Sequence, residues 1–205
     1  MPEGDDAPSG IPDPDAQPQR VSRRPKPATS PVRNAVEWVL VIVGAVAIAL
    51  LVRGNVAQSF KIPSPSMSPT LIEGDRVLVN RLSYKLHDIN RGDVVVFDRP
   101  PSAPAGPDAP KHLIKRVVGL PGETIEARDG VVYIDGRPVD EPYLPEDTQT
   151  YELDDPVDIP EGEIFVMGDN RNNSEDSRFI GTIDEDTVIG RAFSIIWPPS
   201  RIGGL

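Results

Sequence analysis

The sequence contains no cysteine among its 205 residues. Disulfide bonds, thiol nucleophiles and Cys-ligated zinc sites are therefore excluded, and any domain outside the cytoplasm must fold without cross-links. Histidine is scarce as well, because His87 and His112 are the only two. This leaves little for a His-based metal site or for a Ser-His-Asp triad. Nucleic-acid binding requires a basic face, and the formal net charge of −11 argues against it.

Long apolar runs are also lacking, with one exception over residues 35–52 (AVEWVLVIVGAVAIALLV), where Glu37 is the only charged residue. Roughly 18 to 20 helical residues span a hydrocarbon core of about 30 Å. A cleaved signal peptide has a shorter apolar run and leaves through small residues, whereas this run leaves through Leu-Val-Arg-Gly-Asn. A buried core helix would carry a polar face, which is absent here. We therefore expect one transmembrane helix over residues 34–53.

The residues before this run are rich in Pro, Asp, Ala and Ser and show no apolar periodicity. Such a composition cannot bury enough surface to offset its chain entropy, so residues 1–33 are expected to form a disordered tail. The basic residues of the tail gather just before the apolar run, and Arg53 alone follows it. The positive-inside rule then places the tail in the cytoplasm and residues 54–205 outside, in a single-pass protein of the cell membrane.

The outer part, of about 150 residues, is long enough for one compact core. Short apolar segments bounded by Gly, Pro and Asp predict strands at residues 76–80, 93–97, 113–118, 131–134, 163–167 and 191–197. Asp135-Gly136 after the fourth segment is a strong hairpin signal. No long stretch has apolar residues at helical spacing after residue 54. We therefore predict a mostly β outer domain with a small acidic hairpin subdomain inserted at about residues 122–160.

A Ser/Pro-rich segment, Pro63-Ser64-Pro65-Ser66-Met67-Ser68-Pro69, follows shortly after the apolar run. Each proline restricts its own φ and the residue before it, so the segment is expected to be a rigid loop that holds a hydroxyl in one place. Ser66 is the candidate nucleophile. Taken alone, the segment is better explained as a linker between membrane and domain.

Lys115 and Arg116 are neighbours in the predicted strand 113–118, and neighbours in a strand point to opposite faces. One of the two cations must therefore point into apolar surroundings. Burial lowers the pKa of a lysine and can make its amine usable as a general base. On the strand pattern alone, the favoured interpretation is that Lys115 extends along its stem to water.

A dense polar stretch, residues 168–178 (GDNRNNSEDSR), comes directly after the apolar segment 163–167. In an extended segment Ser174, Asp176 and Arg178 would present a hydroxyl, a carboxylate and a guanidinium on one side. The stretch is either an Asx-rich turn or a network that orients a catalytic group. Both interpretations stay open on these residues alone.

Taken together and in this order, the three stretches closely resemble bacterial type I signal peptidase, the leader peptidase of the secretory pathway, in its single-pass form. The resemblance covers roughly residues 35–198 and leaves out the first 33. Pro65 stands where many members of that family carry glycine. The matching segments are residues 62–71 (IPSPSMSPTL), 74–79 (GDRVLV), 91–97 (RGDVVVF), 114–123 (IKRVVGLPGE) and 167–178 (MGDNRNNSEDSR).

The resemblance implies an all-β catalytic domain in which Ser66 attacks the scissile carbonyl and Lys115 removes its proton. The backbone N–H of Ser66 and the hydroxyl of Ser64 would form the oxyanion hole.

Five residues of the polar stretch have supporting roles by the same resemblance. Ser174 would hydrogen-bond and orient Lys115, and Asp176 and Arg178 would form an ion pair. Asp169 and Arg171 would shape the loop behind the site.

The implied substrates are secretory preproteins, cut after small residues at −1 and −3 beside the lipid bilayer, with no metal, cofactor or nucleic acid involved. Two other classes of protein share parts of this pattern. A self-cleaving Ser/Lys repressor on the same scaffold is disfavoured by the apolar run and by the lack of a DNA-binding region. A membrane-tethered, non-enzymatic interaction module with the same fold remains the alternative, since the sequence does not show whether Lys115 is desolvated.

Overall fold

The computed structural model describes residues 31–104, 106, 107, 109–151 and 153–205. Residues 1–30 of the predicted tail, which was expected to span residues 1–33, therefore lie outside the described residues. The chain divides into two compact units, Met1–Gly44 and Ala45–Leu205.

Helix α1 (Pro31–Asn55) contains the long apolar run and begins three residues before the predicted start at residue 34. Trp38, Leu40 and Ile42 are among its exposed apolar side chains. Within the described residues, however, no helix combines the length and the apolar character needed to cross a membrane. The transmembrane helix over residues 34–53 accordingly stays a prediction.

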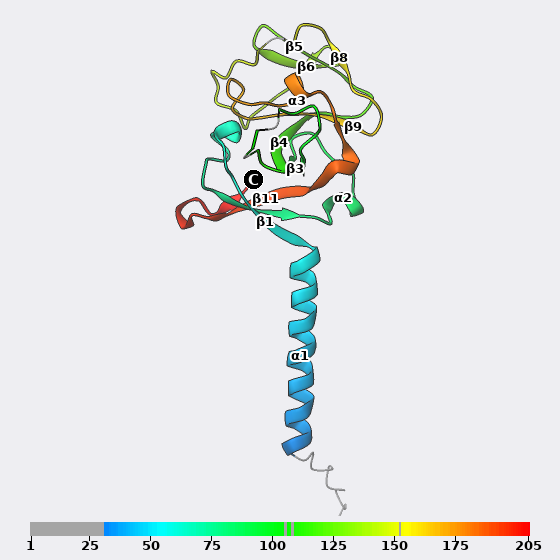
Figure 1. Ribbon diagram of the computed structural model, residues 1–205, viewed down its shortest axis with the longest axis vertical. Coiled ribbons are helices and arrows are strands. Elements are labelled where there is room, and N and C mark those ends of the chain that lie inside the picture. Colours follow the sequence, from blue (N-terminus) through cyan, green and yellow to red (C-terminus); the bar gives the residue numbers. More distant parts are fainter. Residues whose placement is uncertain (1–30, 105, 108, 152) are drawn as a thin grey trace, which may run out of the picture. The chain divides into compact units, whose positions relative to one another are not determined.

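The second unit is mostly β, as predicted, and its main sheet has eight strands. Their order is β1-β2-β11-β3-β4-β9-β10, with β12 beside β11, and every pair is antiparallel. This order puts β4 between β3 and β9, in the interior of the sheet (Figure 1). The strands are β1 (Ala57–Lys61), β2 (Arg76–Asn80), β3 (Val94–Asp98), β4 (His112–Gly119), β9 (Glu163–Met167), β10 (Ile183–Asp184), β11 (Val188–Trp197) and β12 (Gly203–Gly204).

A second, four-stranded sheet lies within the segment 122–160 and is seen at one end of the β-rich unit in Figure 1. Its order is β7-β6-β5-β8, with β5 (Thr124–Arg128), β6 (Val131–Ile134), β7 (Arg137–Pro138) and β8 (Val157–Asp158). Asp135 and Gly136 both have positive φ, as a two-residue hairpin turn requires. The Asp129-Gly130 pair makes the same kind of turn between β5 and β6, which the sequence analysis did not predict.

Packing joins the two sheets. Ile125 and Val132 of the second sheet share one buried hydrophobic cluster with Val118 of β4 and with Phe165 and Met167 of β9. Because these side chains have no other core to bury in, the second sheet depends on β4 and β9 for its stability.

The helical elements of the second unit are short. They are α2 (Ser83–Leu86), α3 (Ser177–Ile180), and the 3₁₀ turns η1 (Pro65–Met67), η2 (Glu185–Thr187) and η3 (Pro199–Arg201).

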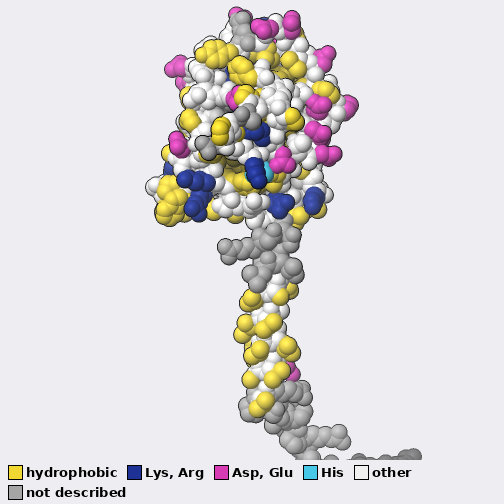
Figure 2. Space-filling view, in the orientation of Figure 1, with side chains coloured by type: hydrophobic (Ala, Val, Ile, Leu, Met, Phe, Trp, Pro, Cys, Tyr) yellow, Lys and Arg dark blue, Asp and Glu magenta, His cyan; other side chains and the backbone are white. Residues whose placement is uncertain are grey.

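Charge is unevenly distributed over the β-rich unit. Residues 122–160 contain twelve acidic and two basic side chains, so this segment alone carries a net charge of −10 out of −11 for the whole chain. Figure 2 shows Asp and Glu side chains over the end of the unit that holds the second sheet, and Lys and Arg side chains toward the other end.

Candidate active site

Ser66 lies in the 3₁₀ turn η1, directly after β1 and a short connection. Pro65 occupies the first position of the turn, where its fixed φ is suitable, and the N–H of Ser68 closes the turn on Pro65 O at 3.0 Å. Met67 and Leu71 are fully buried in the cluster between β1, β2 and β4. These anchors hold Ser66 in place with 8% of its surface exposed, so the segment is a structured turn rather than a linker.

Lys115 comes from β4 and is 4% exposed. Its Nζ donates hydrogen bonds to Ser66 Oγ at 2.9 Å and to Ile114 O at 3.1 Å. Burial lowers the pKa of Lys115 to about 8, against the opposing effects of the Asp176 and Glu175 carboxylates. The alternative in which Lys115 extends to water does not occur.

Arg116, the neighbour of Lys115, is also buried but has a carboxylate partner. Its Nε and Nη2 donate to the two oxygens of Asp169 at 2.8 and 2.7 Å, and Nη1 donates to Gly92 O at 2.8 Å. A bidentate pair of this kind compensates a buried guanidinium. Among the described residues, Lys115 Nζ has only a hydroxyl and a carbonyl as hydrogen-bond partners, so no paired carboxylate offsets the lowering of the lysine pKa by burial.

Two groups lie against the nucleophile turn. Ser64 Oγ is exposed and donates to Ser66 Oγ at 3.4 Å, a long hydrogen bond. Asn170 is hydrogen-bonded to the turn twice, through its N–H to Ser66 O at 3.1 Å and its Nδ2 to Pro65 O at 3.2 Å. The polar stretch 168–178 therefore lies directly beside the nucleophile.

Asp176 and Arg178 form a bidentate ion pair, with Arg178 Nε and Nη2 donating to the carboxylate at 2.8 and 2.9 Å. Asp176 is fully buried and also accepts a hydrogen bond from the N–H of Gly168 at 2.9 Å. Asp176 thus joins the residue after β9, Gly168, to the start of α3. Gly168 lies two residues before Asn170, which binds the nucleophile turn.

Ser174 differs from the expectation. Its Oγ is buried and has no hydrogen-bond partner among the described residues, so the expected hydrogen bond to Lys115 is not present. Its surroundings explain this, because Ser174 Oγ packs over Gly168, where a Cβ atom would lie 2.2 Å from it and 2.4 Å from Ser66 O. Ser174 is therefore close to the nucleophile turn, but Lys115 Nζ turns to Ser66 Oγ and Ile114 O instead.

Asp169 and Arg171 are both buried and each takes a partner from another element. Asp169 binds Arg116 and accepts a hydrogen bond from Thr70 Oγ1. Arg171 donates to Gly168 O at 3.1 Å through Nε. Its guanidinium then reaches out of the polar stretch to the segment 141–150.

That segment supplies residues that the sequence analysis did not single out. Arg171 Nη1 donates to Glu141 Oε2 at 2.9 Å and to Thr150 Oγ1 at 2.7 Å, and the ring of Tyr143 lies 3.9 Å from the guanidinium carbon of Arg116. Burial and the Glu141 carboxylate raise the pKa of Tyr143, so its hydroxyl stays protonated and donates to Glu141 at 2.6 Å. No local pattern marks these positions, because their contacts with Arg171 and Arg116 join residues 21 to 30 positions apart.

Within the described residues no group of three or more His, Asp or Glu side chains is placed to hold a metal ion.

A family model described as "Signal peptidase, peptidase S26" matches residues 35–197. The chain belongs to this signal peptidase family. The match includes the nucleophile turn, the Lys115 strand and the polar stretch, so all the residues predicted for the site lie inside it. The protein is an enzyme, a serine peptidase of the signal peptidase I type.

Several relatives of this peptidase are similar over most of their length. A probable signal peptidase I-1 of Synechocystis is 43% identical over 180 residues, which are 87% of this chain and 91% of the relative. Signal peptidase I T of Bacillus subtilis is 36% identical over 84% of this chain and 91% of its own. A crystal structure of a signal peptidase I from Enterococcus faecalis is 32% identical, covers 51% of this chain and 97% of that one, and has a TM-score of 0.41.

Proposed function

We propose that this peptidase removes N-terminal signal peptides from secretory preproteins, with Ser66 as nucleophile and Lys115 as general base. The observation that carries the proposal is the 2.9 Å contact between Lys115 Nζ and Ser66 Oγ in a buried site. A lysine with a pKa of about 8 is neutral in a sizeable fraction of molecules near neutral pH, whereas a free lysine is almost entirely charged. Only the neutral amine can accept a proton from the serine hydroxyl.

The reaction follows from these two groups. Neutral Lys115 takes the proton of Ser66 Oγ as this oxygen bonds to the scissile carbonyl carbon, and the carbonyl becomes an oxyanion. Collapse of the tetrahedral species breaks the C–N bond, and the Lys115 ammonium gives its proton to the leaving amine. Water then attacks the Ser66 ester with Lys115 again as base, releasing the signal peptide and restoring the serine.

The oxyanion would be bound by the N–H of Ser66 and the hydroxyl of Ser64. Support comes from the position of Ser64 Oγ, 3.4 Å from the nucleophilic oxygen and free to rotate at an exposed site. A donor of this kind contributes about 10²- to 10³-fold in kcat in other hydrolases.

The supporting residues are proposed to hold the base Lys115 and the nucleophile Ser66 at the right distance from each other. Asp176, paired with Arg178, holds the N–H of Gly168, while Asp169, paired with Arg116, holds the strand residue next to Lys115. Ser174 is proposed to orient Lys115 once substrate is bound, since its buried hydroxyl lies beside the nucleophile turn and has no hydrogen-bond partner among the described residues.

Cleavage after small residues at −1 and −3 is part of this proposal, and a cavity of about 200 Å³ is the candidate site for the substrate residues before the scissile bond. Phe60, Ile62 and Ile114 line it together with neighbouring residues of β1 and β4. Ile62 precedes the nucleophile turn and Ile114 precedes Lys115, so the cavity is lined by chain neighbours of both catalytic segments. Its apolar side chains would contact apolar substrate residues on the signal-peptide side of the cleavage site.

We also propose that residues 34–53 attach the peptidase to the cell membrane, with the N-terminus in the cytoplasm and residues 54–205 outside. The proposal rests on the apolar sequence 35–52 and on the basic residues before it. Extraction of cell membranes with alkaline carbonate tests it, since a protein held only by surface charge would be released into the supernatant.

The test of the enzymatic proposal is cleavage of a preprotein by the full-length protein in detergent. Ser66→Ala and Lys115→Met are expected to abolish cleavage, while Lys85→Met, which removes an exposed lysine on α2, leaves the rate unchanged. Activity that survives in Lys115→Met would mean that another group is the base. Intact preprotein with folded wild-type enzyme would favour the alternative, a membrane-tethered module without catalytic function.

A further inference from the structure

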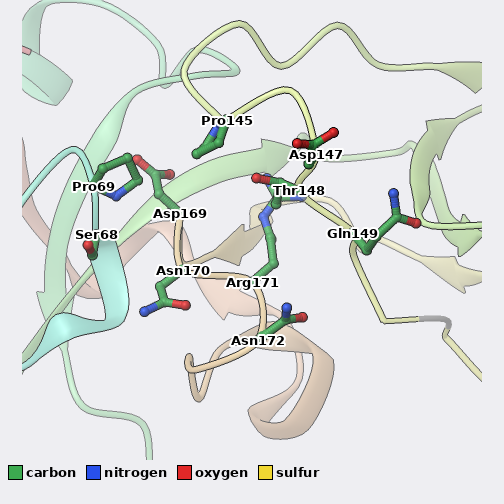
Figure 3. Close-up of a pocket in the computed structure, with 10 residues that line it drawn as sticks. All are labelled: Ser68, Pro69, Pro145, Asp147, Thr148, Gln149, Asp169, Asn170, Arg171 and Asn172. Carbon is green, nitrogen blue, oxygen red and sulfur yellow. The ribbon is translucent and has the colours of Figure 1, made fainter.

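A second cavity lies beside the nucleophile turn, with a volume of about 320 Å³. Figure 3 shows Ser68 and Pro69 on one side of it, the loop 145–149 on the other, and the polar stretch at 169–172 between them. Side chains with amide or hydroxyl groups make up much of its lining. The cavity and the catalytic turn share a wall, because Asn170 lines the cavity and is hydrogen-bonded to both Pro65 O and Ser66 O.

The loop that forms the far wall is held at both of its ends. Glu141 and Thr150 both bind the same guanidinium, that of the fully buried Arg171. Tyr143 in addition stacks on Arg116, the strand neighbour of Lys115. These contacts tie both ends of the loop to the polar stretch and to β4, next to the nucleophile turn.

One charge in the lining is available to a ligand. Asp169 and Arg171 are buried and already paired with Arg116 and Glu141. Asp147 is exposed and has no ion pair with any other described residue. A ligand in the cavity would therefore meet uncharged polar groups and one free carboxylate.

The two cavities differ in polarity, and so do the two sides of a signal-peptide cleavage site, where the signal-peptide side is the more apolar. The cavity at Ile62 and Ile114 is lined mainly by apolar groups, and the cavity at Ser68 and Pro69 is the more polar of the two. Residues 60–63 of the first lining precede Ser66 in the chain, and Ser68 and Pro69 of the second follow it. A peptide bound across Ser66 has its apolar, small-residue side in the first cavity, and the start of the mature protein then extends to the second.

We infer that the polar cavity binds the first residues of the mature chain, and that Asp147 makes the peptidase favour a basic residue over an acidic one there. This inference rests on the proposed function, because it concerns the substrate of the same site. An exposed charge pair contributes little energy, so the expected preference is modest, about three- to tenfold in kcat/KM for Lys over Glu at low ionic strength.

The experiment uses preprotein peptides with one fixed signal sequence and either Lys or Glu at each of the first few positions after the cleavage site. The ratio of kcat/KM values is measured for the wild type, Asp147→Asn and Asp147→Lys. We expect the ratio to fall to about one in Asp147→Asn and to invert in Asp147→Lys. Inversion is a result that a structural defect in the loop cannot produce.

Asp140→Asn is the matched control, since it removes an exposed carboxylate of the same acidic segment outside the cavity lining. It should leave the ratio unchanged. An equal fall of the ratio in Asp140→Asn would assign the preference to the overall electrostatic field of residues 122–160 and overturn the inference. A wild-type ratio of one at every position would overturn it as well. If the wild type cleaves no peptide of the set, the proposed function fails as well, so the two failures are distinguishable.

Discussion

At the scale of single residues, Lys115 and Arg116 are neighbours that have opposite electrostatic environments although both are buried. Arg116 is neutralised by Asp169 within 2.8 Å. Lys115 has no carboxylate within hydrogen-bond distance among the described residues, and Asp176 and Glu175 act on it only through space. Desolvation therefore dominates and lowers the pKa of Lys115, which is the condition for its use as a base.

This leads to a prediction for the pH dependence of cleavage. Below pH 8 Lys115 is mostly protonated, so kcat/KM should rise with pH through about 8. Glu175→Gln removes a carboxylate that raises the pKa of Lys115 and should move the rise to lower pH. Arg99→Gln removes a cation that lowers this pKa and should move it to higher pH.

The measurement is kcat/KM against pH with a peptide that has no group titrating in this range. The two substitutions serve as controls for each other, because a general loss of structure would not move the profile in opposite directions. A flat profile, or shifts of the same sign, would contradict the role of Lys115 as the titrating base.

At the scale of elements, the site depends on the close approach of the nucleophile turn η1 and the end of β9. The N–H of Asn170 binds Ser66 O, and Gly168 passes so close to the turn that its Cα faces Ser66 O and Ser174 Oγ. A side chain at position 168 would occupy the space that lets these two elements meet. Here glycine is required by the lack of space and not by its φ angle.

Gly168→Ala is therefore expected to lower kcat by about 10²-fold with little change in fold, since small displacements of a nucleophile have large kinetic effects. The added Cβ would lie 2.4 Å from a backbone carbonyl oxygen, that of Ser66, and one of the two elements must move. Gly204→Ala is the control, because no atom lies within 4 Å of its Cβ position. Steady-state kinetics measures kcat, and circular dichroism checks that the fold is retained. A wild-type kcat in Gly168→Ala would refute the close-packing argument.

At the scale of the whole β-rich unit, the segment 122–160, which contains the second sheet, carries most of the net charge and is joined to the main sheet by two different kinds of contact. One is the hydrophobic cluster shared by Ile125, Val132 and Phe165. The other is the buried pair of Arg171 and Glu141, which connects the polar stretch of the site to the segment after β7. The unit should consequently unfold in one cooperative transition.

Glu141→Leu would leave the Arg171 guanidinium buried without its carboxylate, which destabilises proteins by about 3–5 kcal/mol. Glu126→Leu removes a carboxylate of the same sheet whose partner Arg128 is half exposed, and its effect should stay below about 1 kcal/mol. Urea unfolding of the full chain in detergent, followed by circular dichroism, compares the two. Equal losses of stability would show that the buried pair does not join the sheets.

Local sequence was sufficient for much of this protein. The six predicted strands are all present, within three residues of their expected ends, because alternating or Val-rich segments and Gly-containing turns act over a few residues. Edge strand β1 (AQSFK) was missed because it has no such pattern. The same local motifs identified the nucleophile turn, the Lys115 strand and the polar stretch, and hence the family.

Only the tertiary structure decided how these parts act together. The strand order β2-β11-β3-β4-β9 does not follow the chain, so residues 49 and 53 positions apart, such as Ser66 with Lys115 and Arg116 with Asp169, come into contact. Which of two adjacent cations is left without a carboxylate depends on those contacts, and so does the position of the loop that ends at Glu141 and Thr150. Sequence patterns act between neighbours in the chain, whereas burial, pairing and pKa are set by neighbours in space.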